Sequence, residues 1–154
     1  MLAAIALGSN LPSPFGGPEA NLREAFLRLR ALGEVKAISS IRLTDPVGYV
    51  NQPRFANAAA LLETGLPPLT LLRELLAIEQ TFGRDRASAP PKGPRTLDLD
   101  LLLYGTDVLS SPELTLPHSA LHERRFVLEP LAEIAPLWRH PTLHKTVTEL
   151  LAEI

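Results

Sequence analysis

Residues 93–105 read GPRTLDLDLLLYG, a short apolar run that carries two aspartates one residue apart. Glycine at each end of the run favours a strand bounded by turns. Because side chains alternate across a strand, Asp98 and Asp100 are expected on one face, with their Cα atoms about 6.6 Å apart. The opposite face should be apolar and point into the core, with Leu97, Leu99, Leu101 and Leu103.

The aspartate pair suggests a metal site. Two carboxylates this close repel each other, and one would be pushed toward protonation unless a cation lay between them. Hard divalent ions such as Mg²⁺ or Mn²⁺ suit such oxygen ligands, and Mg²⁺ commonly bridges protein carboxylates to substrate phosphates. A nucleotide polyphosphate is therefore the leading ligand class. An exposed strand face with two solvated aspartates would explain the pair, taken alone, equally well.

The loop before this strand is basic. Arg84, Arg86, Lys92 and Arg95 stand there against one acid, Asp85. Phosphoryl transfer needs cations that hold negative charge on the transferring group, opposite a metal ion. A solvated connector is the competing interpretation of such a loop. Its direct continuity with the aspartate strand favours the phosphate-binding interpretation.

The rest of the chain is predicted to alternate between strands and helices. Periodicity and turn residues indicate strands over 2–7, 35–44 and 55–63, helices over about 18–32 and 69–82, a short strand near 108 and a last helix over roughly 145–153. This order predicts an α+β fold, a ferredoxin-like βαββαβ antiparallel sheet with helices on one face and a C-terminal helical addition.

Length and composition narrow the function classes. At 154 residues the chain is expected to form one domain, 1–154. A net charge of −2 argues against a protein that coats nucleic acid or binds membranes electrostatically. Without cysteine there are no disulfides and no thiolate metal site. With no basic leader and no long apolar run, we expect a cytoplasmic monomer without nucleic-acid or membrane partners.

Several motifs together resemble one enzyme family. In chain order they are LGSNL (7–11), DPVGYVNQPRFANAA (45–59), GR (83–84), GPRTLDLDLLLYG (93–105), LTLPH (114–118) and RRF (124–126). They are similar to those of hydroxymethyldihydropterin pyrophosphokinase, a family of folate biosynthesis. The resemblance covers nearly the whole chain, and its R-T-L-D-L-D segment is highly specific. It implies Mg²⁺-dependent transfer of pyrophosphate from ATP to the hydroxymethyl group of 6-hydroxymethyl-7,8-dihydropterin, with release of AMP.

The resemblance also implies roles for individual residues. Asp98 and Asp100 would bind two Mg²⁺ ions, and Arg84 and Arg95 would be the catalytic arginines. The pterin would be bound by Thr44, Pro46, Val47, Phe55, Asn57 and Phe126. ATP would be bound by Arg86, Lys92, Leu101, Thr115, His118 and Arg124.

A purely structural role would also account for some of these residues. Phe55 and Phe126 could be ordinary core, although a flat heterocycle gains from stacking between two rings. Asn57 can offer the pterin edge a donor and an acceptor, or pair with a neighbouring backbone group. The chain departs from the family pattern at Pro91, Lys92, Leu76 and Glu113, all near the expected adenine and lid contacts.

Two rival functions fit part of this pattern. A metal-dependent phosphohydrolase would use the same aspartates with water as nucleophile, but it needs a residue that activates water, and none is evident beside the pair. A binding module without catalysis would leave two aspartates and several arginines together without purpose.

Overall fold

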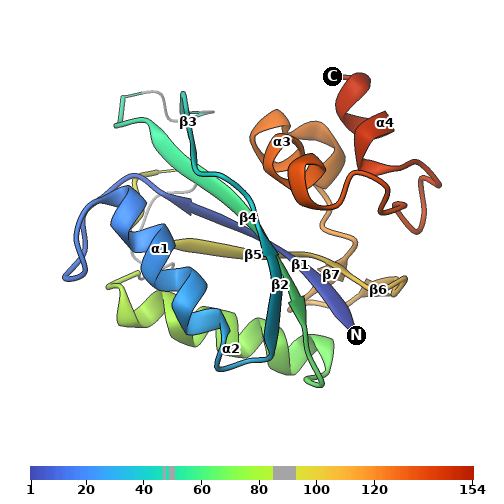
Figure 1. Ribbon diagram of the computed structural model, residues 1–154, viewed down its shortest axis with the longest axis horizontal. Coiled ribbons are helices and arrows are strands. Elements are labelled where there is room, and N and C mark those ends of the chain that lie inside the picture. Colours follow the sequence, from blue (N-terminus) through green and yellow to red (C-terminus); the bar gives the residue numbers. More distant parts are fainter. Residues whose placement is uncertain (47, 49–50, 85–92) are drawn as a thin grey trace.

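A five-stranded antiparallel sheet forms the centre of the molecule (Figure 1). The computed structural model describes residues 1–46, 48, 51–84 and 93–154. The strands are β1 (Leu2–Ser9), β2 (Glu34–Ile38), β3 (Arg42–Thr44), β4 (Phe55–Glu63) and β5 (Asp98–Tyr104). Their order is β2-β4-β1-β5, and β3 also pairs with β4. β5 is therefore an edge strand, next to the central β1.

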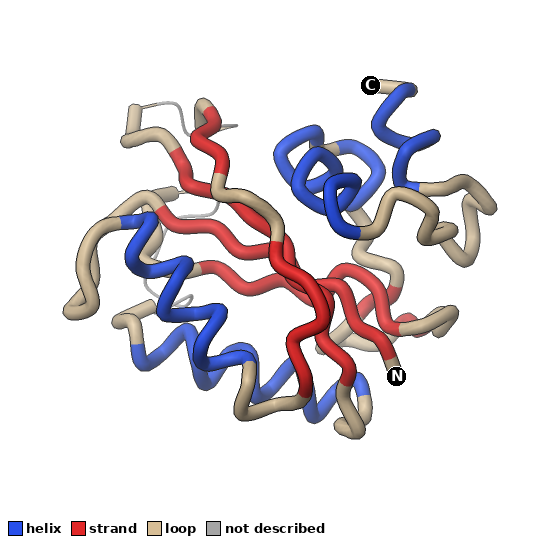
Figure 2. Tube along the Cα trace, viewed as in Figure 1, coloured by secondary structure: helices blue, strands red, loops and turns tan. Residues whose placement is uncertain are grey.

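Helices cover both faces of this sheet (Figures 1 and 2). α1 (Pro18–Leu29) and α2 (Pro68–Thr81) pack on one face, while α3 (Arg125–Ile134) and α4 (Val147–Ala152) pack on the other. A hairpin of β6 (Leu109–Ser110) and β7 (Thr115–Leu116) and a 3₁₀ turn (Leu121–Glu123) connect β5 to α3. Every helix among the described residues is too short or too polar to cross a bilayer.

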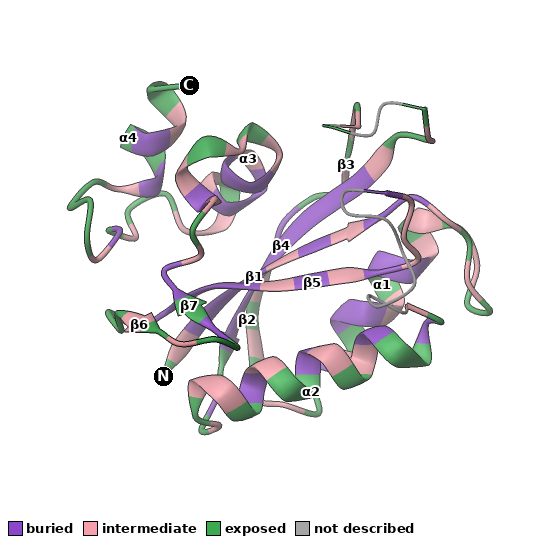
Figure 3. Ribbon diagram, turned by 180° about the vertical axis from the view of Figure 1, so that it is seen from behind, coloured by how far each residue is buried: buried purple, intermediate pink, exposed green. Residues whose placement is uncertain are grey.

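The predicted α+β class and its antiparallel sheet are confirmed. Helices on a single face describe α1 and α2 only, because the C-terminal addition covers the opposite face. The more specific ferredoxin-like assignment stays a prediction. Figure 3 shows that buried residues gather along β1 and β4, in the middle of the sheet. These strands are buried because helices pack on both faces of the sheet.

The predicted strand over 35–44 is divided in two. Ser39 donates its backbone N–H to the Ala59 carbonyl (2.9 Å), but it is its side-chain oxygen that accepts the Ala59 N–H (2.8 Å). Ser40 turns away from β4 and donates to Glu133 on α3 instead. The hydroxyl thus replaces a backbone acceptor, and the ladder is interrupted between β2 and β3.

The core face of β5 was predicted correctly except at its end. Leu97, Leu99 and Leu101 lie in the core beneath α1 and α2, as expected. Leu103 instead packs in the second core, with α3. The pairing of β5 with β1 shifts between Ile5↔Leu101 and Ala4↔Leu103, so one extra residue enters β5. Such a bulge reverses the alternation of side chains beyond it.

Polar contacts hold α3 to the β2–β3 connection. Ser40 donates its N–H and hydroxyl to the Glu133 carboxylate at 3.0–3.1 Å. The Arg42 guanidinium donates to Glu129 (3.2 Å) and to Glu133 (3.4 Å). These four residues, Ser40, Arg42, Glu129 and Glu133, are called the α3 clamp below. They join segments about ninety residues apart in the sequence.

The decrease in the free energy of unfolding at acidic pH should depend in part on the contacts of Glu133. Folding lowers the pKa of Glu133 from its ordinary value of 4.5, chiefly because the Ser40 N–H donates to the carboxylate. A carboxyl whose pKa is lowered in this way stabilises the fold above its unfolded pKa. That contribution disappears as the pH falls through the folded pKa.

Glu133→Gln should therefore flatten the decline in the free energy of unfolding below pH 4.5. The difference should stay below about 1 kcal/mol, because more than a third of the side chain is exposed and solvent screens it. Urea unfolding measured across the acidic range tests this, with Glu74→Gln on the exposed face of α2 as the matched control. Parallel pH profiles for wild type and Glu133→Gln would contradict the assignment.

Candidate active site

The sheet face beneath α3 holds side chains from three adjacent strands. Gly8 of β1 pairs with Asn57 of β4 on one side and with Asp98 of β5 on the other. Residues directly opposite in a sheet point to the same face. Asn57, Gly8 and Asp98 therefore form one row across the sheet, and Asp100 follows two residues along on the same face.

Small residues between the polar ones leave this surface open. Gly8 has no side chain, and a Cβ placed there would lie 3.4 Å from Asn57 Oδ1. Asp100 is opposite Ala6, another small residue. The result is a pocket that encloses about 650 Å³, open solvent at its mouth included. Its lining comprises Gly8, Thr44, Asp45, Phe55, Asn57, Arg95, Asp98, Asp100, Arg124 and Phe126.

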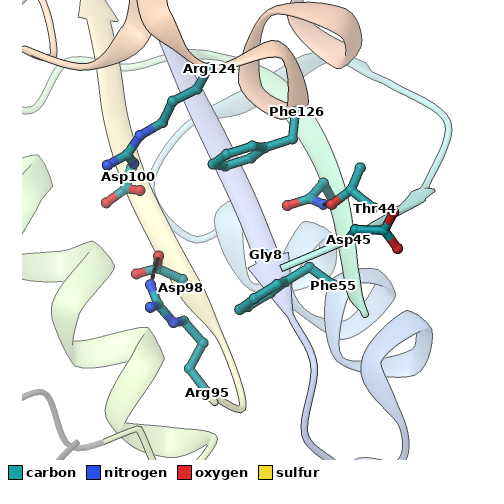
Figure 4. Close-up of a pocket in the computed structure, with 10 residues that line it drawn as sticks. Gly8, Thr44, Asp45, Phe55, Arg95, Asp98, Asp100, Arg124 and Phe126 are labelled. Carbon is teal, nitrogen blue, oxygen red and sulfur yellow. Dashed lines mark hydrogen bonds and ion pairs between the residues drawn. The ribbon is translucent and has the colours of Figure 1, made fainter. Parts of the chain in front are cut away.

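Arg95 and Asp98 form a well-shielded ion pair in the pocket (Figure 4). Arg95 Nη1 lies 2.8 Å from Asp98 Oδ2, and each side chain is 16% exposed. The same guanidinium lies over the Phe55 ring, 5.5 Å from its centroid. Arg95 N–H also donates to Asn10, which fixes the backbone from which the side chain extends. Low exposure makes this pair stronger than an ordinary surface pair.

Two phenyl rings form opposite walls of the pocket. Figure 4 shows Phe55, from the start of β4, across the pocket from Phe126, the second residue of α3. Arg124 lies over Phe126, 5.8 Å from the ring centroid, and Figure 4 shows it extending toward the aspartate strand. A flat aromatic ligand between the two rings would lie near two guanidinium groups, Arg95 beside Phe55 and Arg124 beside Phe126.

Asn57 is nearly buried, with 6% of its surface exposed. Its amide donates to the Thr44 hydroxyl on β3, so its partner is a side chain rather than a neighbouring backbone group. Thr44 and Asn57 together present hydroxyl and amide groups on one wall of the pocket. This is the wall expected to read the edge of a pterin.

The remaining predicted site residues are more scattered. Thr115 and His118 line a second hollow, beside the β6–β7 hairpin, together with His122 and His140. Leu101 is 2% exposed and its side chain belongs to the core.

Arg84 follows α2 and is half-buried. Its backbone N–H donates to the Glu79 carbonyl (3.2 Å). Arg84 does not line the pocket. Pro46 is half-buried beside Asp45 and is also absent from the lining. Val47, Arg86 and Lys92 lie outside the described residues.

Sequence reasoning gave Asn10 too small a part. Asn10, in the turn after β1, is 2% exposed and links the segment of Gln52 and Pro53 to Arg95. Its Nδ2 donates to Gln52 Oε1 (2.9 Å) and to the Pro53 carbonyl (3.0 Å), while its Oδ1 accepts the Arg95 N–H (2.8 Å). The signal was an amide residue directly after a buried strand. Asp45, in the lining, was also missed.

The donor set suits a hard divalent ion. Within the part of the chain that the structure describes, no three histidine, aspartate or glutamate residues converge on a possible metal position. Asp98 and Asp100 on one face of β5 would therefore supply carboxylate oxygen only. Mg²⁺ accepts few protein ligands and takes the rest from water and phosphate, so these two residues fit it.

Comparisons with known proteins agree with one another. Residues 4–136 match the family described as 7,8-dihydro-6-hydroxymethylpterin-pyrophosphokinase. A 2-amino-4-hydroxy-6-hydroxymethyldihydropteridine pyrophosphokinase of Pseudomonas aeruginosa is 47% identical over 148 residues, which cover 96% of this chain and 88% of that protein. A Bacillus subtilis protein of the same name is 44% identical over 135 residues, covering 86% and 77%.

The fold has a counterpart among solved structures. A Plasmodium falciparum HPPK-DHPS protein crystallised with pteroate matches 99% of this chain with a TM-score of 0.74. At 15% sequence identity this likeness concerns the fold alone. The present chain spans 42% of that longer protein.

Replacing Asn10 with alanine should destabilise the protein. The change leaves the Arg95 N–H and the Pro53 carbonyl without their partner, which should lower the free energy of unfolding by about 1–3 kcal/mol. Urea unfolding at neutral pH measures it, with the exposed Asn51→Ala as control. A loss no larger than that of the control would mean that the buried amide is not a structural clamp.

Proposed function

The chain belongs to the 7,8-dihydro-6-hydroxymethylpterin-pyrophosphokinase family, and from that premise we propose that it transfers pyrophosphate from ATP to 6-hydroxymethyl-7,8-dihydropterin in an Mg²⁺-dependent reaction that releases AMP. Members of the family are pyrophosphokinases of folate biosynthesis. The observation that carries the proposal is one pocket that combines the Asp98 and Asp100 carboxylates with two guanidinium groups and two opposed phenyl rings. Few reactions need all three together.

The carboxylates form the metal-binding end of the proposed site. Asp98 and Asp100 would hold Mg²⁺, two ions by analogy with the family, which when bound supplies Lewis-acid stabilisation of phosphate charge. The edge strand β5 fixes both side chains on one face through its pairing with β1. Their position therefore depends on the sheet rather than on a loop.

The arginines would hold the phosphate chain. In the structure Arg95 donates to Asp98, and the phosphates of ATP would offer it further charged acceptors in the same pocket. Arg124 extends into the pocket from the start of α3 and would hold the chain from the other end. Arg84, at the end of α2, is the second proposed catalytic arginine and would act from the segment that follows.

The pterin would lie between Phe55 and Phe126. Stacking on both faces of a flat ring favours this placement, and the Asn57 amide and Thr44 hydroxyl are on the adjoining wall. Pro46 and Val47 would supply backbone groups to the same edge. In this position the hydroxymethyl group would face the aspartate strand.

The reaction is a displacement at the β-phosphorus. The hydroxymethyl oxygen forms a bond to the β-phosphorus, the bond from that phosphorus to the oxygen shared with the α-phosphate breaks, and AMP leaves with that oxygen. The hydroxyl proton is released. Arg84 and Arg95, the proposed catalytic arginines, would contribute by holding negative charge on the phosphates as it redistributes.

The adenosine would bind along the outer edge of β5, the edge that does not pair with β1. The Leu99 N–H donates outward across this edge, to Glu79 Oε2 of α2 (2.7 Å). Alternate residues of a strand turn their backbone groups to the same edge, so Leu101 would present its backbone there although its side chain is buried. Thr115 and His118, beyond the same edge, and Arg86 and Lys92 complete the proposed nucleotide contacts.

One assay separates this function from its rivals. The protein is incubated with ATP, Mg²⁺ and 6-hydroxymethyl-7,8-dihydropterin, and AMP is measured. The proposal expects AMP that appears only when the pterin is present. Inorganic phosphate without pterin would indicate a phosphohydrolase, and no turnover would indicate a binding module.

Removing either carboxylate charge should stop the reaction. Asp98→Asn and Asp100→Asn keep the side-chain shape but weaken metal and charge stabilisation, and each should lower kcat by at least about 100-fold. Asp107→Asn, in the turn after β5, is the matched control and should keep wild-type rates. Near-wild-type turnover in either site variant at ordinary Mg²⁺ would remove that residue from the proposed metal site.

A further inference from the structure

The width of the proposed pterin pocket depends on where α3 lies. Phe126 is the second residue of α3, whereas Phe55, Thr44 and Asn57 belong to the sheet. A flat ring fits only if the distance between Phe126 and the sheet residues leaves room for one ring, with each of its faces in contact with a phenyl ring. Whatever holds α3 at a fixed position over the sheet therefore controls how well the pterin is bound.

Apolar packing holds α3 against the sheet. Val127, Leu128 and Leu131 of α3 pack in the second core, against sheet residues that include Ala59 and Leu61. Hydrophobic contact is non-directional, whereas hydrogen bonds and ion pairs require particular distances and angles. Polar contacts between α3 and the sheet therefore add a directional constraint to this apolar interface.

The α3 clamp supplies the directional contacts. Arg42 on β3 is opposite Asn57 in the register, and Thr44 is opposite Phe55, so all four point toward α3. From β3 the Arg42 guanidinium reaches Glu129 (3.2 Å) and Glu133 (3.4 Å).

Contacts from neighbouring groups complete the clamp. The N–H and hydroxyl of Ser40 hold the Glu133 carboxylate at 3.0–3.1 Å. Arg125 on α3 itself lies 3.5 Å from the other oxygen of Glu129. The clamp thus joins α3 to the strand that carries Thr44.

The clamp is better suited to setting position than to adding stability. Its three charged side chains are 33–38% exposed, and pairs this exposed contribute little to folding. Its geometry is nevertheless specific, because one guanidinium meets two carboxylates one helical turn apart. A sliding or rotating α3 would break these bonds and move Phe126 at the same time.

We propose that Arg42, Glu129 and Glu133 are positioning residues for the pterin: they hold α3 where Phe126 can stack against a ring that rests on Phe55. This inference rests on the proposed function. Loss of the clamp should weaken pterin binding more than nucleotide binding, because Phe126 of the proposed pterin site is part of α3, whereas the described nucleotide contacts Leu101, Thr115, His118 and Arg124 precede the helix.

The test uses Arg42→Met, which keeps the stem of the side chain, and the double variant Glu129→Gln/Glu133→Gln. Arg23→Met breaks an exposed ion pair on α1, on the opposite face of the sheet, and is the matched control. The dissociation constant of 6-hydroxymethyl-7,8-dihydropterin is measured by calorimetry with a non-hydrolysable ATP analogue and Mg²⁺ present. The dissociation constant of the analogue is measured alone, and Tm checks the fold.

Both clamp variants should raise the pterin dissociation constant about 3- to 10-fold while changing that of the analogue less than about 2-fold. Arg42→Lys should recover part of the affinity. Combining Arg42→Met with Glu129→Gln/Glu133→Gln should add little, because all three changes break the same contacts. High salt should weaken pterin binding in wild type more than in Arg42→Met.

Unchanged pterin affinity in folded clamp variants, with normal binding by wild type, would overturn the positioning role alone. An equal rise in both dissociation constants would also overturn it, since general loosening would then explain the result. Failure of the wild-type protein to bind the pterin would overturn the proposed function, and this inference with it.

Discussion

The arrangement depends on one register: Gly8 lies between Asn57 and Asp98 across three neighbouring strands. Because opposite residues of a sheet share a face, this pairing places an amide, an open position and a carboxylate in a row. A shift of one residue in β5 would turn both aspartates into the core beneath α1 and α2, where carboxylates would be buried without a metal or phosphate partner. Pocket and fold are thus specified by the same backbone hydrogen bonds.

The two faces of the sheet have different roles: one forms a continuous core, and the other carries the pocket. Beneath α1 and α2 the strands contribute large aliphatic side chains such as Leu99 and Leu62, which form a continuous core. Beneath α3 the strands contribute leucines such as Leu61 and Leu103 as well as small residues, and the small residues Gly8 and Ala6 lie opposite the two aspartates, where the pocket opens. The pocket is open because the sequence places small residues there, and the opposite core stabilises the sheet that carries it.

Local patterns in the sequence predicted the features that depend on residues close together in the chain, such as the faces of a strand and the start of a helix. Alternation placed Asp98 and Asp100 on one face and three of the four leucines in the core, and Pro18 marked the start of α1. Leu103 was misplaced because a bulge depends on how β1 and β5 align, which no single strand reveals.

Contacts between segments far apart in the sequence could not be predicted either. Asn10 meets Arg95, and Arg42 meets Glu129, without any spacing that would signal it. Resemblance to a family brought Thr44, Phe55 and Phe126 together, but it could not show that Thr115 and His118 line a separate hollow.

We propose that the Asp98–Asp100 face holds divalent ions against the phosphates of a nucleotide. A crystal structure with a non-hydrolysable ATP analogue, Mg²⁺ and the pterin is the decisive test. We expect Mg²⁺ on carboxylate oxygens of both aspartates, phosphates in contact with Arg95, and the pterin between Phe55 and Phe126. A nucleotide bound with its phosphates in the hollow beside His122 and His140, and no metal on either aspartate, would contradict it.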